Sequence, residues 1–229
     1  MTLDPTLLAG KRVLLTHANH FMGPALREVF EDHGAEVIAD EDPLEDAFAA
    51  TRVVTAAGPI DVLLAHLAEP APVTLAHEVT EAEWHRVFGR LVNPLPLLLR
   101  AVLPQMLARK SGRILVIGSA SALRGMAGKS TYSAARGAQL AYVQSVGVEL
   151  ARHGVQVNAI AQNFVENATY FPPELQATPE FQQRVDREVP LGRLVSARED
   201  AMFCAYLCSD SAGCFVGQVF PVSGGWAVR

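Results

Sequence analysis

The sequence predicts an α/β fold built on one doubly wound parallel sheet. Segments with strand and helix patterns alternate along the whole chain with short connections, and the strand-like segments are apolar runs such as Asp-Val-Leu-Leu-Ala at 61–65. Continuous apolar strands are typical of a parallel sheet covered by helices on both faces. A length of 229 residues suits one such domain, and no repeat or low-complexity linker divides it. We therefore predict a single Rossmann-like domain over residues 1–229.

Each element follows from a local signal. The first apolar run is followed by an amphipathic segment that ends at Gly34, and Thr80-x-x-Glu83 and Ser196-x-x-Glu199 have the form of capping boxes that open helices. We predict strands at 12–16, 35–39, 61–65, 113–117, 155–159 and 218–221. We predict helices at 23–33, 43–57, 80–108, 130–153 and 196–209, with irregular chain from 160 to 173.

Composition excludes several classes of protein. An apolar fraction of 50% with a charged fraction of 19% indicates a well-packed globule, and a net charge of −5 without a basic stripe argues against a nucleic-acid partner. The apolar stretch 91–107 contains Asn93, prolines and Arg100, so we predict no membrane span there. The first ten residues lack the pattern of a signal peptide, which favours a cytoplasmic location.

The sequence also argues against a bound metal. Cys204, Cys208 and Cys214 are odd in number and lie in one late segment without an obvious further ligand, so we interpret them as buried or incidental thiols. His17 and His20 follow the first predicted strand and His66 the third, and the three lack the carboxylate spacing of a ligand set. We predict no metal site.

Three residues have the spacing of a catalytic set. Ser119 follows the strand 113–117, and Tyr132 and Arg136, four residues apart, share one face of the next helix. A tyrosine titrates near pH ~10 in water, so its use as a base near pH ~7.5 requires ~3.4 kcal/mol. One positive charge at ~5 Å supplies roughly 3.3 kcal/mol at an effective dielectric of ~20. Arg136 is therefore sufficient to make Tyr132 a base, and Ser119 would hold the substrate oxygen by a hydrogen bond.

With this set, the chain resembles the short-chain dehydrogenase/reductase superfamily over nearly its whole length. The resemblance rests on the Ser119–Tyr132 spacing, on Asn93 in the long helix, on Val-Gln-Val-Asn-Ala-Ile at 155–160 and on Gly-Gln-Val-Phe-Pro-Val-Ser-Gly-Gly at 217–225. The resemblance implies a Rossmann-like fold and favours a homotetramer.

Two departures from the reductase pattern concern the cofactor. Reductases carry a lysine that grips the nicotinamide ribose where this chain has Arg136. Their Thr-Gly-x-x-x-Gly-x-Gly turn reads Thr-His-Ala-Asn-His-Phe-Met-Gly at 16–23, so His17 and Phe21 replace two glycines. Those glycines let the backbone approach a pyrophosphate. The Asn-Ala-Gly-like motif after the third strand is also absent, since 65–68 reads Ala-His-Leu-Ala. We predict that no redox cofactor binds.

This combination is similar to the halohydrin dehalogenase branch, which keeps the Ser-Tyr pair, carries Arg for Lys and fills the nicotinamide space with a halide pocket. The closer resemblance lies in the aromatic residue after the first strand and in the loop 162–172, where Gln162 stands in place of a common proline. It implies catalytic Ser119, Tyr132 and Arg136; halide or nucleophile binding by Phe21, Gln162, Asn163, Phe164 and Val165; and a substrate pocket of Ala120, Leu123, Met126, Tyr170 and Phe171.

The chemistry implied by this resemblance needs no redox step. Tyr132 would deprotonate a hydroxyl beside a carbon–halogen bond, and the alkoxide would displace the halide to close an epoxide. The backbone N–H groups of Phe164 and Val165 and the ring edge of Phe21 suit a leaving halide. In reverse, azide, cyanide or nitrite would open an epoxide. Two alternatives remain at this stage: a nicotinamide-dependent oxidoreductase with an atypical arginine, and a catalytically inactive binding or scaffold homologue.

Overall fold

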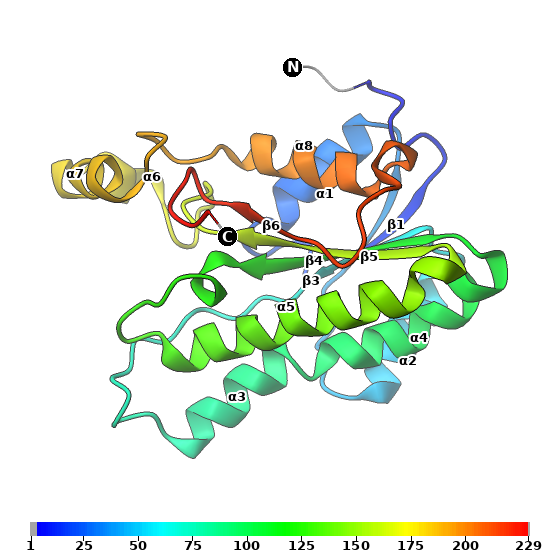
Figure 1. Ribbon diagram of the computed structural model, residues 1–229, viewed down its shortest axis with the longest axis horizontal. Helices are drawn as coiled ribbons and strands as arrows, with labels where there is room; N and C mark the ends of the chain where they lie inside the picture. Colours follow the sequence, from blue (N-terminus) through cyan, green and yellow to red (C-terminus); the bar gives the residue numbers. More distant parts are fainter. Residues whose placement is uncertain (1–3, 229) are drawn as a thin grey trace.

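The centre of the molecule is one parallel sheet of six strands. The computed structural model describes residues 4–228, and its strands lie in the order β2-β1-β3-β4-β5-β6 (Figure 1). The chain moves outward from β1 to β2 and then crosses to the other side for β3, which makes the sheet doubly wound, as the sequence predicts. The strands are β1 Arg12–Thr16, β2 Glu36–Asp40, β3 Val62–His66, β4 Gly112–Ser119, β5 Val155–Gln162 and β6 Val219–Val222.

Helices cover both faces of this sheet. Helices α1 and α8 pack together on one face, while α2, α3, α4 and α5 cover the other (Figure 1). Two clusters of buried apolar side chains fill the two interfaces between sheet and helices. The helices are α1 Gly23–Asp32, α2 Ala47–Ala57, α3 Glu81–Leu91, α4 Pro94–Arg109, α5 Ser130–Leu150, α6 Pro173–Gln176, α7 Pro179–Glu188 and α8 Ala197–Cys208.

The long helix expected over 80–108 is instead two helices. Helix α3 ends at Leu91 and α4 begins at Pro94, because a proline lacks the N–H of a continuing helix and disfavours helical backbone in the residue before it. The capping box expected at Thr80 is half formed. The Thr80 hydroxyl accepts the Glu83 N–H at 3.1 Å, but the Glu83 carboxylate bonds elsewhere, to Thr74 and Thr131.

Other boundaries differ by less. Helix α2 begins at Ala47, four residues later than expected, because the Asp46 carboxylate caps it by accepting the Ala49 N–H at 2.7 Å. The capping box at Ser196 is complete and opens α8. The segment between β5 and α8, expected to be irregular only to residue 173, also contains α6 and α7, which the sequence interpretation did not include.

By length and composition alone, the stretch Glu81–Arg109 could cross a membrane, a test that core helices of other proteins also pass. Its structure gives another reason for the apolar composition. The stretch is divided before Pro94, and α4 buries Leu98, Val102 and Met106 among the core residues beside α2, β3 and β4. The apolar side chains therefore serve packing against the sheet.

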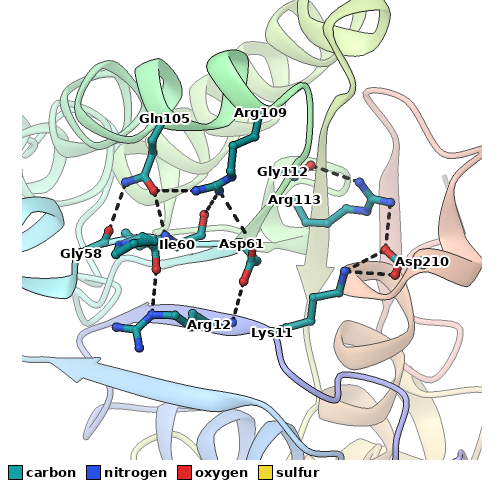
Figure 2. A network of polar contacts seen from close by, with 11 residues as sticks. Lys11, Arg12, Gly58, Ile60, Asp61, Gln105, Arg109, Gly112, Arg113 and Asp210 are labelled. Atoms are coloured by element: carbon teal, nitrogen blue, oxygen red, sulfur yellow. Dashed lines mark hydrogen bonds and ion pairs between the residues drawn. The ribbon is translucent and has the colours of Figure 1, made fainter.

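The amino ends of the strands are joined by a network of charged and polar groups (Figure 2). Asp61, just before β3, accepts the Arg12 N–H at 2.9 Å and lies 3.9 Å from Arg109. Asp210 lies 2.9 Å from Lys11 and 3.7 Å from Arg113. This edge of the sheet is tied together by paired charges.

The carboxyl ends of the strands carry the residues singled out from the sequence. Ser119 at the end of β4 and Gln162 at the end of β5 are paired neighbours in the sheet register. The loops after β1, β3, β4 and β5 therefore meet at one edge, where parallel α/β sheets place their ligand sites.

Candidate active site

A cavity of about 260 Å³ opens at this carboxyl edge. It is smaller than the ~300–1,000 Å³ typical of sites for drug-sized ligands, so it suits a small substrate. Its wall combines residues from the loops after β1, β3, β4 and β5 with residues from α5 and α7. The lining residues are Phe21, Met22, His66, Ala71, Ile117, Gly118, Ser119, Ser121, Met126, Lys129, Tyr132, Arg136, Gln162, Asn163, Phe164, Val165, Asn167, Tyr170, Phe171 and Arg184.

Ser119, Tyr132 and Arg136 all lie on this wall. Ser119 is held at the end of β4 by its neighbour Ser121, whose backbone N–H donates to the Ser119 Oγ at 3.2 Å and whose Oγ lies 3.0 Å from it. Tyr132 lies in the first turn of α5, on the helix face that packs into the core. The structure therefore brings the predicted hydroxyl, phenol and guanidinium groups together at one cavity.

Arg136 is a buried cation whose partners are neutral. Only 7% of the residue is exposed. Its Nη1 donates to the Ile117 carbonyl at 3.1 Å and to the Gln139 side chain at 3.0 Å, and its Nη2 donates to the Leu67 carbonyl at 3.2 Å. No ion pair within residues 4–228 includes Arg136, and its Nε is buried without a partner in that range.

The guanidinium carbon of Arg136 lies 5.1 Å from the centre of the Tyr132 ring. A positive charge ~5 Å from a phenolate contributes roughly 3 kcal/mol by Coulomb's law at an effective dielectric of ~20. An unpaired buried cation favours a negative charge beside it. The nearest group able to supply one by losing a proton is the Tyr132 phenol.

A second phenol, that of Tyr170, faces the same cavity and has a different environment. Burial and the nearby Tyr132 together raise the pKa of Tyr170 to about 12, against the lowering effects of Arg136 and of the Ala71 backbone N–H, which donates to the Tyr170 hydroxyl at 2.9 Å. Tyr170 therefore stays protonated near neutral pH. Two phenols in one cavity then have different roles, one beside a cation and one kept neutral.

The turn after β1 has backbone angles that favour glycine, although His17 and Phe21 stand at two of the glycine positions. His17 and Phe21 have φ values of 47° and 43°, the left-handed region in which glycine is favoured. Gly23 is retained, and a Cβ there would lie 2.2 Å from the Ala18 carbonyl oxygen. The turn therefore has the path of the reductase turn, while two ring side chains fill the space beside it.

The side chains of His17 and Phe21 each make specific contacts with neighbouring residues. The His17 Nδ1 accepts the Ala68 N–H at 2.9 Å, which ties the turn to the chain after β3. Phe21 lines the cavity and lies 5.1 Å from the Tyr170 ring and 6.5 Å from the His66 ring. His66 is itself buried, and its Nδ1 lies 3.1 Å from the His17 carbonyl oxygen. Burial lowers the pKa of His66 to about 3, so it is neutral.

These residues do not fit a nicotinamide dinucleotide. The two glycine positions carry His17 and Phe21, and the Nη groups of Arg136 donate to two carbonyls and one amide oxygen instead of facing a ribose. The close approach of backbone to pyrophosphate that the glycines allow is therefore blocked by side chains.

The loop after β5 is held in place by side-chain bonds within it. The Asn163 Oδ1 accepts the Phe164 N–H at 2.9 Å, and the Asn167 Oδ1 accepts the Tyr170 N–H at 2.8 Å. Phe164 has a φ of 51° and its ring stacks with that of Phe171. Of the two backbone N–H groups expected to face a halide, that of Phe164 is therefore already bonded, whereas that of Val165 has no hydrogen-bond partner among residues 4–228.

The charges on the cavity wall are all positive. Lys129, Arg136 and Arg184 line it, and no aspartate or glutamate of the described chain does. The Lys129 Nζ donates to the Ala71 carbonyl at 2.8 Å, and desolvation lowers the pKa of Lys129. Arg184 lies over the Phe164 ring at 5.2 Å and pairs with the partly exposed Glu188. The cavity is thus electrostatically suited to an anion.

Most of the residues expected at the site line the cavity, with two corrections. Phe21, Met126, Tyr170, Phe171 and the four residues 162–165 lie on the wall. Ala120 and Leu123 are not among the lining residues; Ala120 is buried in the main apolar core and Leu123 packs against it. Lys129, Arg184 and His66 were not expected as lining residues. Arg184 lies on α7, which the sequence interpretation lacked, so nothing in the local pattern pointed to it.

The thiols and histidines form no metal site within residues 4–228, where no three His, Cys, Asp or Glu side chains gather in a ligand arrangement. Cys204 and Cys208 are buried and Cys214 is exposed, and all three are free thiols.

Comparison with known proteins gives the family. The model of the enoyl-(acyl carrier protein) reductase family matches residues 7–227, so the chain belongs to the short-chain dehydrogenase/reductase superfamily. A 3-oxoacyl-(acyl-carrier-protein) reductase of Vibrio cholerae is 30% identical over 95% of this chain and 98% of its own length.

Two solved structures are similar to this one as well. A protein described as a dehalogenation enzyme has a TM-score of 0.90 and 32% identity, with 96% of this chain and 100% of that chain covered. A halohydrin dehalogenase bound to ethyl (2S)-oxiran-2-ylacetate has a TM-score of 0.86 and 26% identity, with 96% and 98% covered. The chain is thus similar both to reductases and to dehalogenases.

Proposed function

We propose that this protein is a halohydrin dehalogenase, which converts vicinal halohydrins to epoxides reversibly and without a cofactor. The observation that carries the proposal is the environment of Arg136. This buried cation has no carboxylate partner among the described residues, lies 5.1 Å from the Tyr132 ring, and borders a cavity without an acidic side chain. The charge is therefore available to stabilise a phenolate during catalysis.

The reaction follows from this arrangement. Tyr132, as phenolate, takes the proton of the substrate hydroxyl, which Ser119 orients through its Oγ. The resulting alkoxide attacks the neighbouring carbon, the carbon–oxygen bond of the epoxide forms, and the carbon–halogen bond breaks with its electron pair on the departing halide. The proton remains on Tyr132 until it passes to solvent. In reverse, an anion opens the epoxide and Tyr132 returns the proton to the alkoxide.

The departing halide needs donors that hold it without trapping it. We assign this task to the wall formed by Phe21 and residues 162–165, with Val165 N–H as the free backbone donor. The N–H of Phe164 contributes only if Asn163 releases it. The positive potential of the cavity favours chloride and bromide as products and azide, cyanide or nitrite as nucleophiles in the reverse direction.

A nicotinamide-dependent oxidoreductase is the second candidate, because the Vibrio cholerae relative is a reductase and the whole chain aligns with it. The filled glycine positions at His17 and Phe21 oppose it. An inactive scaffold is opposed by the Ser119, Tyr132 and Arg136 set. The homotetramer and the cytoplasmic location implied earlier stay predictions.

An assay of halide release tests the proposal. The purified chain is incubated with 1,3-dibromo-2-propanol without added cofactor, and free bromide and acid are measured. We expect both to appear in equal amounts. A parallel incubation with NADH and NADPH should show no consumption of either. Carbonyl reduction coupled to NADH or NADPH consumption, without bromide release, would support the oxidoreductase instead, and no turnover in either assay would support the scaffold.

A further inference from the structure

A buried carboxylate lies directly behind the cavity wall. Asp200 on α8 is fully buried, with 0% exposed. Its Oδ2 accepts the Gln162 Nε2–H at 2.6 Å and faces the Cys204 thiol at 3.8 Å. Its Oδ1 is buried with no partner in the described chain. A carboxylate in this setting has neither a cation nor a full set of hydrogen bonds to offset the loss of water.

Gln162 connects this carboxylate to the site. It is the last residue of β5, lies beside Ser119 in the sheet register, and lines the cavity. It also begins the loop to which we assign halide binding. In the structure one of the two N–H groups of its amide nitrogen donates to Asp200, so only the second N–H remains as a donor, beside a carbonyl Oε1 that accepts hydrogen bonds and repels an anion.

We infer that Asp200 is a positioning residue that orients the Gln162 amide and so couples anion binding in the cavity to the uptake of one proton. This inference rests on the proposed function. When Asp200 is ionised, it takes one of the two N–H donors of Gln162 Nε2, and its negative charge behind the wall opposes a bound anion. When Asp200 is protonated, its O–H donates to Gln162 Oε1. The Nε2 is then free to donate to a halide, and the negative charge behind the wall is gone.

The environment of Asp200 allows this proton to be exchanged near neutral pH. Burial raises the pKa of Asp200 to about 7, while the bonds from Gln162 and Cys204 lower it. Burial also raises the pKa of Cys204 well above its usual range, so Cys204 stays a thiol. Charged groups on the elements packed against α8 form ion pairs. Glu28 and Asp32 of α1 pair with Arg198 of α8, and Arg113 of β4 pairs with Asp210 in the turn that follows α8.

On the cavity side, His66 and Tyr170 are not expected to change charge in this range, whereas Tyr132, the base of the proposed function, lies on the same wall and could also take up a proton. His66 is neutral, with its pKa lowered by burial to about 3, and Tyr170 is neutral, with its pKa raised by burial to about 12. Tyr132→Phe removes the second group that could take up a proton, so proton uptake on anion binding near pH 7 in this variant would report on Asp200.

The test measures bromide binding by the full chain with sodium bromide as the probe. Isothermal titration calorimetry in buffers of different ionisation enthalpy gives the affinity and the protons taken up. We expect the affinity to fall about tenfold between pH ~6 and pH ~8, because binding selects the protonated form. In a Tyr132→Phe background, Asp200→Asn should bind bromide with no such fall and no proton uptake. Asp186→Asn, which changes an exposed carboxylate on α7, is the control and should keep both.

A second variant tests the same inference if Asp200→Asn does not fold. Gln162→Met keeps the length of the side chain without the amide, so its bromide affinity should fall less than that of wild type from pH ~6 to ~8, with only the charge of Asp200 left to act. If wild-type protein releases bromide from a bromohydrin but its bromide affinity is constant over this range, the inference is wrong and the proposed function stands. If the wild-type chain neither binds bromide at any pH nor turns over, both are wrong.

Discussion

The cations at the two ends of the sheet have different kinds of partner. At the amino end, Lys11, Arg109 and Arg113 each lie within ion-pair distance of a carboxylate (Figure 2), and Arg12 pairs with Glu36. At the carboxyl end, the buried Arg136 has only carbonyl and amide oxygens as partners, and no acidic residue of the described chain lines the cavity.

This contrast separates groups that stabilise the fold from groups that are available for chemistry. A buried cation without a counter-charge costs folding free energy. Under the proposed function, that cost falls where a negative charge arises during catalysis, either on Tyr132 or on a bound anion. The cations of the amino end already have carboxylate partners.

The largest expected effect comes from removing the base at the carboxyl end. Tyr132→Phe keeps the ring and removes the hydroxyl, so halide release should fall by roughly 10³-fold or more, in keeping with the contribution of general bases. Tyr142→Phe, on the same helix but outside the cavity wall, is the matched control and should keep full activity. Steady-state kcat/KM for a bromohydrin measures both. Substantial activity in Tyr132→Phe would assign the base to another group.

The second prediction compares an arginine from each end. Arg136→Gln removes a charge worth ~3 kcal/mol to a phenolate, so kcat/KM near pH 7 should fall about 100-fold and the rising limb of the pH–rate profile should move to higher pH. Arg136→Lys should have weak or no dehalogenase activity, because the donor geometry of lysine differs from that of arginine. It should also gain no reductase activity, because His17 and Phe21 still fill the turn.

The matched variant is Arg12→Gln at the amino end. Arg12 bonds Glu36 and the carbonyls of Pro59 and Ala57, so its loss should lower the free energy of unfolding by about 1–2 kcal/mol and leave the pH–rate profile in place. If the rising limb is unchanged in Arg136→Gln, or moves as far in Arg12→Gln, the contrast between the two ends does not explain the base.

The third prediction concerns stability against pH. Because burial raises the pKa of Asp200 to about 7 in the folded chain, the folded state binds more protons than the unfolded state between pH ~4 and ~7, and stability falls as pH rises through that window. Between pH ~5 and ~8 this one group costs about 2–3 kcal/mol. Urea unfolding at several pH values should show a smaller loss in Asp200→Asn than in wild type. Parallel curves for the two proteins would contradict the assignment.

The smallest effect is expected from Phe21→Trp. The larger ring narrows the cavity beside the loop 162–165, so inhibition by bromide or chloride should weaken by a few-fold, with a smaller change in the proton-transfer step. Initial rates at increasing bromide concentration give the inhibition constant. Unchanged inhibition would place the halide elsewhere.

Much of the fold could be predicted because its signals are local. The strand β1 matches its expected bounds, and the capping box at Ser196 opens α8 as expected. The break between α3 and α4 was missed because the apolar pattern continues through Pro94. Helix α7 was also missed, although Thr178 caps it by accepting the Phe181 N–H, with a proline at the next position.

The candidate site was predictable where one strand or helix fixes the side chains, as for Ser119, Tyr132 and Arg136. It was not predictable where distant segments meet. Leu123 was expected on the cavity wall but packs against the core, and the contact between Gln162 and Asp200 joins residues 38 apart in the sequence. Such contacts depend on how α8 and α7 sit against the sheet.

The most direct test of the central claim is to locate an anion at the carboxyl end of the sheet. Crystals of the wild-type chain soaked in bromide should give an anomalous peak in the cavity between Phe21 and residues 162–165, near the Val165 N–H, and soaking with NADH or NADPH should leave that space free of dinucleotide. A dinucleotide bound along the turn at His17 and Phe21, or a cavity that stays without bromide while halohydrin is turned over, would contradict the account.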